Sequence, residues 1–368
     1  MPTALISGAG IAGTALAYWL HHHGFAVTTV ERAPALRPGG QAVDIRGVAL
    51  DVADRMGILP QAQKLRTRMR GMSVLDGDGN EIMRSTEATY SAGRLDSPDL
   101  EILREDLAGL VHERTREHVE YVFDDAITAV AQRADGVRVE FQRGEPRDFD
   151  LVVGADGLHS GVRRLVFGPE RQFLRPMGTY LAVFSMDNVL DLDNWQLWLR
   201  DGHAGFAIYP VRDNTQLRVT LGFGGEPIEY DHRDVEQHKR IVAQRLSGLG
   251  WETPRLLKAM ATAPDFYFDE MAQVSMDRWS SGRVTLLGDA AYCPSPMSGQ
   301  GTSLALVGAY LLARELAAAG GDHPAAFDRY ERRMRPFVAV NQALATENPG
   351  GPPAEESVER AKNAIALD

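Results

Sequence analysis

The chain has 368 residues, of which 44% are hydrophobic, and a formal net charge of −11. This length and composition predict about two or three domains with sizeable apolar cores. The acidic charge argues against nucleic acid and anionic membrane surfaces as main partners, because both attract clustered lysine and arginine. Small uncharged or weakly charged ligands remain open as partners.

The cysteine content and the apolar stretches bear on the cellular compartment. Cys293 is the one cysteine, which excludes an internal disulfide, and the N-terminal residues lack the basic and apolar regions of a signal peptide. The longest apolar stretch, residues 304–320, is interrupted by Arg314 and Glu315. It is shorter than the roughly 20 residues that a membrane span needs. We therefore expect a cytoplasmic protein without a membrane span.

Residues 3–31 predict a strand, a glycine turn, a helix and a second strand that ends at Glu31. The turn holds a Gly-x-Gly-x-x-Gly pattern formed by Gly8, Gly10 and Gly13. In such a turn the first glycine permits the bend, the second lets the backbone approach a pyrophosphate, and the third lets the helix pack on the strand. Glu31 stands where a carboxylate can accept hydrogen bonds from ribose hydroxyls. The segment indicates dinucleotide binding and leaves NAD and FAD open as ligands.

Two arginines follow at the edges of predicted helices. Arg46 precedes a helix expected over residues 47–56, and Arg104 lies on a helix expected over residues 99–115, with Leu103 on its inward face. Each arginine is either an ordinary surface charge or a contact to the nucleotide, since a guanidinium binds phosphate well. Between the two helices, an Asp-Gly-Asp-Gly tip predicts a hairpin over residues 72–85.

A second glycine-bearing segment, DLVVGADGLHSGVRRLVFG, occupies residues 150–168. It predicts a short apolar strand, a turn with Asp156 and Gly157, and a helix that carries Ser160 and Arg163. Taken alone, such a strand and turn are common in α/β proteins and carry little functional information.

Residues 178–268 are rich in predicted strands and contain one predicted helix over residues 230–248. This block lacks nucleotide motifs, and its aromatic residues include Trp195, Trp198 and Tyr209. It is therefore the candidate for a wall that shapes a substrate site. The alternative is that most of these aromatic residues form the core of the sheet, because aromatic residues are enriched in strands.

The segment GDAAYCPSPMSGQG, residues 288–301, offers no nucleophile with a paired base and no metal-ligand spacing. The run His21, His22 and His23 does not suggest a metal site either, because adjacent helical residues point about 100° apart. We therefore expect no catalytic side chain of the nucleophile type and no metal.

Three segments stand in a fixed order: GAGIAG with Glu31, DLVVGADGLHSGVRR, and GRVTLLGDAAYCPSPMSGQGTSLA. Together they resemble the single-component (group A) FAD-dependent monooxygenases of the para-hydroxybenzoate hydroxylase type. The resemblance is strongest to the compact branch that includes the tetracycline-degrading monooxygenases. Three motifs in register between residues 8 and 305 make a far more specific match than any one of them.

The resemblance implies an α/β fold with an α+β insert. Its parts are a glutathione-reductase-like Rossmann FAD-binding domain and an antiparallel-sheet substrate domain. The FAD-binding domain is discontinuous and comprises residues 1–70, 97–177 and 269–335. The substrate-binding domain comprises residues 71–96 and 178–268, and residues 336–368 form a C-terminal helical tail.

The resemblance also implies which residues bind FAD, which is expected to be non-covalent. Asp289 is implied to bind the ribityl chain, and the residues from Gly299 to Thr302 to lie against the isoalloxazine. A helix that begins near Gly301 would direct free N–H groups and a partial positive charge at the flavin. The expected FAD-binding residues are Gly8, Gly10, Ala12, Gly13, Glu31, Arg32, Arg46, Arg104, Asp156, Gly157, Gly288, Asp289, Pro296, Gly299, Gln300, Gly301, Thr302 and Ser303.

The chain departs from the family pattern at Tyr292, where relatives often have histidine, and at Ser303, where they often have asparagine. Roles tied to those two side chains are therefore open. Cys293 stands next to the expected flavin site, but with no second cysteine it cannot form a disulfide relay.

The implied reaction is reduction of FAD by NADH or NADPH, capture of O2 as a flavin C4a-hydroperoxide, and hydroxylation of an aromatic or polyketide-like small molecule. The expected substrate pocket is formed by Gln196, Tyr209, Pro210 and Pro296. We expect a monomer or weak homodimer. The alternatives are an FAD-dependent reductase or halogenase-like enzyme on the same fold, and an FAD-bound protein that sequesters a small molecule without turnover. The Trp-x-Trp-x-Ile-Pro signature of the halogenases is absent.

Overall fold

The computed structural model describes residues 1–348 and 351–368. Its first layer is a six-stranded sheet in which all neighbours are parallel except the edge pair β19 and β20. In sheet order the strands are β19 (Ser280–Ser281), β20 (Val284–Leu286), β13 (Leu151–Gly154), β1 (Thr3–Ser7), β2 (Ala26–Glu31) and β9 (Glu120–Phe123). Parallel pairing places the carboxyl ends of β1, β2 and β13 at one edge of the sheet, where α/β proteins bind their ligands.

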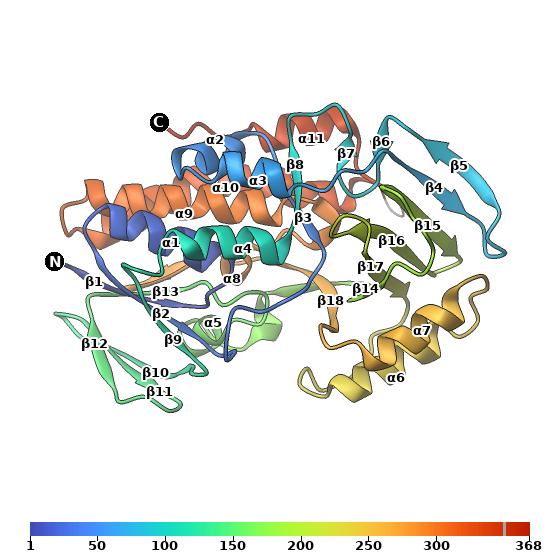
Figure 1. The fold of residues 1–368 in the computed structure, drawn as a ribbon. Helices are drawn as coiled ribbons and strands as arrows, with labels where there is room; N and C mark the ends of the chain where they lie inside the picture. The colour runs from blue at the N-terminus through green and yellow to red at the C-terminus, as the bar shows by residue number, and fades with distance from the viewer. Residues whose placement is uncertain (349–350) are drawn as a thin grey trace.

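Helices cover both faces of this sheet (Figure 1). On one face α9 packs against α1, α2 and α10, and α4 packs beside α1. The opposite face carries α5 and a three-stranded antiparallel sheet. These elements are α1 (Ile11–His22), α2 (Val48–Arg55), α3 (Leu59–Leu65), α4 (Arg104–Glu113), α5 (Gly161–Val166), α9 (Gly301–Ala318), α10 (His323–Glu347), β10 (Ile127–Gln132), β11 (Val137–Phe141) and β12 (Arg147–Phe149).

A seven-stranded sheet forms the second half of the molecule, at the right of Figure 1. Its order is β18 (Tyr267–Val274), β14 (Leu174–Asp187), β17 (Gln216–Gly224), β16 (Ala204–Val211), β15 (Trp195–Asp201), β4 (Gly71–Leu75) and β5 (Glu81–Ser85). Every neighbouring pair is antiparallel except β15 and β4. Helices α6 (Val235–Leu246) and α7 (Thr253–Thr262) cover one face of this sheet. The mixed α/β architecture expected from the sequence is confirmed.

Strand β16 shows how the two faces of the antiparallel sheet differ. Phe206 and Ile208 belong to the apolar core under α6 and α7, whereas Ala207 and Tyr209 line the large cavity on the other face. This alternation follows from the period of two along a strand. One face of the sheet therefore stabilises the domain, and the other is free to shape a ligand site.

The remaining elements are short, and several of them lie around the cavity. They are β3 (Ala42–Ile45), β6 (Ala88–Thr89), β7 (Gly93–Arg94), β8 (Leu100–Leu103), η1 (Glu170–Gln172), α8 (Asp289–Tyr292), η2 (Pro296–Ser298) and α11 (Glu355–Lys362). Among the described residues, none of the helices is both long and apolar enough to cross a membrane.

The structure differs from the sequence-based expectation at three points along the chain. Residues 99–115 do not form one helix, because Leu100–Leu103 pairs with β3 as strand β8 and the helix starts only at Arg104. The four residues of β8 are all buried, and so short an apolar run fits strand and helix equally well. The block 178–268 contains a second helix, α7, besides the expected one. Helix α10 is continuous across residue 335, where the sequence analysis places a domain boundary.

A buried charge network connects the two halves of the molecule. Arg218 on β17, with 1% of its side chain exposed, forms ion pairs with Asp265 (2.9 Å) and with Glu105 on α4 (3.1 Å). The same Glu105 accepts a hydrogen bond from the backbone N–H of Gly39. It also forms an ion pair with Arg212, whose side chain is 38% exposed. Arg218 therefore supplies the counter-charge of Asp265, and it shares Glu105 with Arg212.

We predict that Arg218→Met lowers the free energy of unfolding by about 3–5 kcal/mol, because it leaves the Asp265 carboxylate, whose side chain is only 11% exposed, without its counter-charge. The matched change Arg212→Met removes a more exposed partner of the same Glu105 and should cost about 0–1 kcal/mol. Urea denaturation followed by circular dichroism measures both variants. Equal losses would contradict the role given to Arg218.

Candidate functional site

A cavity of about 1740 Å³ lies between the carboxyl edge of the parallel sheet and the free face of the antiparallel sheet. Its lining comes from the β1–α1 turn, the end of β2, the segment after β13, the loop 289–302, and strands β4, β15 and β16. Pockets for one small ligand have volumes of about 300–1,000 Å³. The cavity is therefore large enough for a dinucleotide together with a second molecule.

The glycine turn has the geometry that the motif requires. Gly8 has a φ of +105°, which strongly favours glycine, and a Cβ at Gly13 would collide with the carbonyl oxygen of Gly8. Gly10 lines the cavity, and a Cβ built on it meets no atom within 4 Å. The N-terminus of α1 is thus open to the cavity, as a pyrophosphate site needs.

Glu31 ends strand β2 and lines the same cavity. Its Oε2 accepts a hydrogen bond from the N–H of Ala9 (2.9 Å), and its Oε1 accepts one from the N–H of Ala33 (2.9 Å). These two bonds fix the carboxylate against the glycine turn. Each oxygen retains a lone pair that can accept a hydrogen bond from a ribose hydroxyl.

The loop before α9 presents polar groups to the cavity. Gly299 is left-handed with a φ of +65°, and α9 starts at Gly301, so its first N–H groups face the cavity. Gln300 is fully buried, yet neither its side-chain nitrogen nor its side-chain oxygen has a hydrogen-bond partner in the protein. Buried amides almost always have partners. This side chain, which lines the cavity, is therefore available to a ligand.

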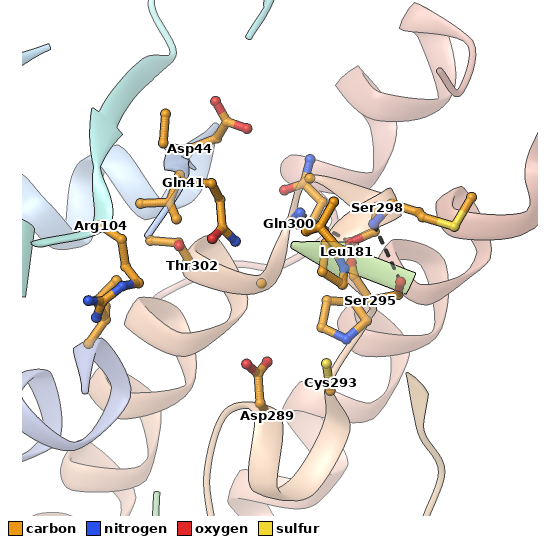
Figure 2. A pocket seen from close by; sticks show the side chains of 18 of the residues that line it. Gln41, Asp44, Arg104, Leu181, Asp289, Cys293, Ser295, Ser298, Gln300 and Thr302 are labelled. Carbon is orange, nitrogen blue, oxygen red and sulfur yellow. Dashed lines mark hydrogen bonds between the residues drawn. The ribbon is translucent and has the colours of Figure 1, made fainter. Parts of the chain in front are cut away.

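Asp289 and Cys293 belong to the same loop, and Figure 2 shows both side chains pointing into the cavity. Burial raises the pKa of the Asp289 carboxyl above its ordinary value, and it raises the pKa of the Cys293 thiol. A hydroxyl of a bound ligand would provide the carboxylate with the donor that a buried charge needs. Cys293 is a protonated thiol here, without the low pKa of a reactive cysteine.

Arg104 and Arg46 both line the cavity, but protein groups hold them firmly. Arg104 donates to the backbone carbonyl groups of Arg37 and Gly39 (2.9 Å to the latter), and burial lowers its pKa to about 10. Arg46 donates to Asp44 (2.9 Å) and to the carbonyl of Ser91 (2.8 Å). Each guanidinium keeps a buried Nε–H without a protein partner.

The segment after β13 divides into a cavity side and a structural side. Asp156 and Gly157 line the cavity, and Asp156 accepts hydrogen bonds from the Ser160 hydroxyl and the N–H of Val162 (3.1 Å). Burial raises the pKa of Asp156. Arg163 is fully buried and donates to the carbonyl of Ala290 (2.9 Å). It therefore supports the α8 loop from behind and does not line the cavity.

Most of the expected FAD residues line the cavity. These are Gly8, Gly10, Ala12, Glu31, Arg32, Arg46, Arg104, Asp156, Gly157, Asp289, Pro296, Gly299, Gln300, Gly301 and Thr302. Gly13, Gly288 and Ser303 do not line the cavity. They lie behind the lining residues and shape the backbone next to it. The Ser303 hydroxyl accepts a hydrogen bond from the N–H of Arg46 (3.0 Å).

The four expected substrate residues divide evenly. Tyr209 and Pro296 line the cavity, whereas Gln196 and Pro210 are not in its lining. Gln196 is fully buried, donates to the Ser91 hydroxyl (2.6 Å) and accepts from Nε1 of Trp198 (3.0 Å).

Gln196 therefore holds two lining residues in place from behind. Trp198 packs edge-on against Tyr90, with their ring centroids 5.3 Å apart, and both line the cavity. The aromatic side of the cavity thus comes from Trp198 on β15, which the sequence analysis placed in the candidate wall, and from Tyr90 in the loop between β6 and β7, which it did not assign to the site.

Tyr292, one of the departures from the family pattern, faces away from the cavity. Its ring is buried, its hydroxyl lies 3.0 Å from that of Tyr330, and it packs directly on Gly308. It therefore belongs to the core between α8, α9 and α10.

Sequence reasoning missed Asp44 and Glu101, which are cross-strand partners on β3 and β8 and line the cavity. Burial raises the pKa of Asp44 to about 7, although the Arg46 charge opposes this shift. The signal in the sequence was weak, because an aspartate two residues before an arginine is common on surfaces.

The residues present fit FAD. The open glycine turn and Glu31 match the adenosine and pyrophosphate end, while Asp289, Gln300 and the start of α9 match the ribityl chain and the isoalloxazine. The strongest support for FAD is the side-chain amide of Gln300, which has no hydrogen-bond partner in the protein. The edge of a flavin ring offers both the donors and the acceptors that this amide needs.

Comparisons with known proteins agree with this geometry. A family model described as an FAD binding domain matches residues 1–344. An uncharacterized protein of Mycobacterium tuberculosis is 52% identical over 369 residues and covers 100% of this chain and 99% of its own length. A flavin-dependent monooxygenase from an unknown prokaryotic organism is 42% identical and covers 92% of this chain and 87% of its own.

Among solved structures, the tetracycline destructase Tet(55) is similar, with a TM-score of 0.88 and 37% identity over 99% of this chain and 98% of that one. The resemblance drawn from the three motifs is confirmed, and the monooxygenase is favoured over the halogenase-like, reductase and sequestering alternatives. The chain therefore belongs to the FAD-binding-domain family and is an FAD-dependent monooxygenase.

Proposed function

We propose that this monooxygenase uses NADH or NADPH and O2 to hydroxylate an aromatic or polyketide-like small molecule. The observation that carries the proposal is one continuous cavity with a polar half that fits FAD and an aromatic half formed by Tyr90, Trp198 and Tyr209. Its volume of about 1740 Å³ leaves room for a multi-ring substrate beside the cofactor. The similarity to a tetracycline destructase supports the same substrate class.

Bound FAD supplies the electron transfer and oxygen activation that amino-acid side chains lack. The chain provides binding and orientation. Glu31 would hold the adenosine end by hydrogen bonds, and Asp289 would accept hydrogen bonds from hydroxyls of the ribityl chain. The N–H groups and partial positive charge at the start of α9 would stabilise negative charge on the flavin ring edge.

The aromatic half excludes water and orients the substrate. Tyr209 has 4% of its surface exposed, and its hydroxyl accepts a hydrogen bond from the N–H of Ala42 (2.8 Å), so the ring has a fixed orientation. Burial raises the pKa of this phenol, which keeps it neutral. A rigid apolar wall of this kind limits the unproductive loss of reducing equivalents to hydrogen peroxide.

Overall, one oxygen atom of O2 enters the substrate and the other leaves as water, with two electrons from the reduced nicotinamide. The sequence has no second Gly-x-Gly-x-x-Gly in a strand-turn-helix context. We therefore propose that the nicotinamide docks transiently at the same cavity. The proposal includes non-covalent FAD, a cytoplasmic location and a monomer or weak homodimer. Flavin release on denaturation and gel filtration test the first and the last.

The direct test mixes the FAD-loaded protein with NADH or NADPH and with tetracycline or other multi-ring phenols and enols. We expect substrate-stimulated oxidation of the nicotinamide, uptake of O2, and a product that carries one added oxygen atom by mass spectrometry. Nicotinamide oxidation that no such substrate stimulates, without an oxygenated product, would reject the substrate class.

We predict that Asp289→Ala weakens FAD binding by about 1.5–3 kcal/mol, the usual contribution of a hydrogen bond to a charged acceptor. This corresponds to roughly a 10- to 150-fold higher Kd, measured by flavin fluorescence during titration of the apoprotein. Asp277→Asn changes an exposed carboxylate near β19 and serves as the control. Unchanged affinity in a folded Asp289→Ala protein would remove Asp289 from the FAD site.

Strand β16 permits a matched test of the substrate wall. Tyr209→Ala opens the cavity side, whereas Ile208→Ala removes the adjacent residue on the side packed under α6 and α7. We expect Tyr209→Ala to lower the yield of oxygenated product per nicotinamide consumed, with FAD retained. Ile208→Ala should mainly lower the melting temperature, by a loss of about 2–5 kcal/mol in stability. The assignment is wrong if the two variants change the product yield equally.

A further inference from the structure

Three side chains from distant parts of the chain meet beside the main cavity. His159 lies in the loop between β13 and α5, His232 precedes α6, and Asp269 lies on β18. One ligand atom from each residue, a ring nitrogen or a carboxylate oxygen, lies within 4.8 Å of the other two, and the two imidazole centroids are 4.4 Å apart. Among residues 1–348 and 351–368, this is the one such group of three histidine, cysteine or acidic residues.

The distances within the group are close to those of a metal site. Nε2 of His159 lies 3.0 and 3.1 Å from the two carboxylate oxygens of Asp269. Two ligands on one tetrahedral zinc ion, each about 2.0–2.1 Å from the metal, are separated by about 3.3 Å. His159 and Asp269 therefore need only small shifts to share an ion. His232 is exposed, its ring packs against those of His159 and Tyr230, and it must turn toward the ion.

The surrounding residues orient these two ligands from behind. Nδ1 of His159 lies 3.0 Å from the Glu170 carboxylate, so that Nε2 faces Asp269. The Tyr267 and Tyr230 hydroxyls donate to the Asp269 carboxylate at 3.0 and 3.2 Å. A carboxylate behind a ligating histidine and hydrogen bonds to a ligating carboxylate are the usual support of a protein metal site.

The group also has an open side. His159, His232 and Asp269 line a second cavity of about 310 Å³, and His159 and Asp269 line the main cavity as well. A fourth ligand, such as a water molecule or an oxygen atom of a small molecule, can approach from there. Two imidazoles and one carboxylate with an open position are a donor set that suits Zn²⁺ and Co²⁺.

We propose that His159, His232 and Asp269 form a binding site for a divalent transition metal of the zinc type, separate from the FAD site. Binding replaces the proton that His159 Nε2 shares with Asp269 by the metal ion, and this proton leaves to solvent. The bound ion connects the loop after β13, in the parallel-sheet half, to β18 and the segment before α6. It therefore ties the two halves together beside the main cavity.

The experiment uses the FAD-loaded protein, freed of metal with a chelator and then titrated with Co²⁺. We expect uptake of a single tightly bound Co²⁺ and the intense visible difference spectrum of a low-coordinate N/O site. His232→Gln should abolish both. Glu170→Gln keeps the three ligands and removes the carboxylate behind His159, so it should weaken Co²⁺ binding by about 10- to 100-fold.

His22→Gln is the matched control, because it removes an exposed histidine that lies outside the proposed site. This variant should bind Co²⁺ like the unmodified protein. The flavin spectrum and far-ultraviolet circular dichroism confirm that each variant is folded. The proposal is overturned if no Co²⁺ binds, if His232→Gln leaves binding unchanged in a folded protein, or if the signal is lost in His22→Gln.

Discussion

The close approach of Gly13 to the carbonyl oxygen of Gly8 is the contact on which the rest of the site depends. It lets α1 start directly at the carboxyl end of β1, so that the helix N-terminus opens at the edge of the parallel sheet. Helix α9 packs on α1, and the start of α9 follows the loop that carries Asp289 and Gln300. The proposed adenine end and the proposed flavin end of the FAD site are thus positioned through one pair of packed helices.

Buried charges hold the two halves of the molecule around the cavity. Arg218 reaches from the antiparallel sheet to Glu105 on α4 (3.1 Å). His159 bridges Glu170 and Asp269 in the same way. A buried ion pair adds little net stability, but removing one partner leaves an unpaired buried charge and is strongly destabilising. Each pair therefore favours the one arrangement of the elements in which both partners meet.

The parts of the site that local sequence determines could be predicted, and those that depend on tertiary pairing could not. The glycine turn and the loop 288–302 combine residue types that few other conformations accept, so Gly8, Gly10 and Asp289 could be placed from the sequence. Strand β8 is too short to show a period and takes its conformation from pairing with β3.

The aromatic residues of the block 178–268 suggested a wall, but which face of the sheet the helices would cover depends on the rest of the fold. Gln196 was therefore expected in the cavity, although it supports Trp198 from behind. His159, His232 and Asp269 are more than thirty residues apart in sequence, and only the fold brings them together.

The contact between Tyr292 and Gly308 has a consequence for the evolution of related chains. The Tyr292 hydroxyl occupies the space where a side chain at position 308 would lie, and it lies 3.0 Å from the hydroxyl of Tyr330. The three positions form one steric unit, so a change at one of them requires compensation at another. Homologous sequences that carry histidine at position 292 release volume against α9, and they can admit alanine or serine at position 308. Substitutions at these three positions should therefore covary among homologues. They should do so without changes in the residues that line the cavity, because the three positions lie in the core behind the loop.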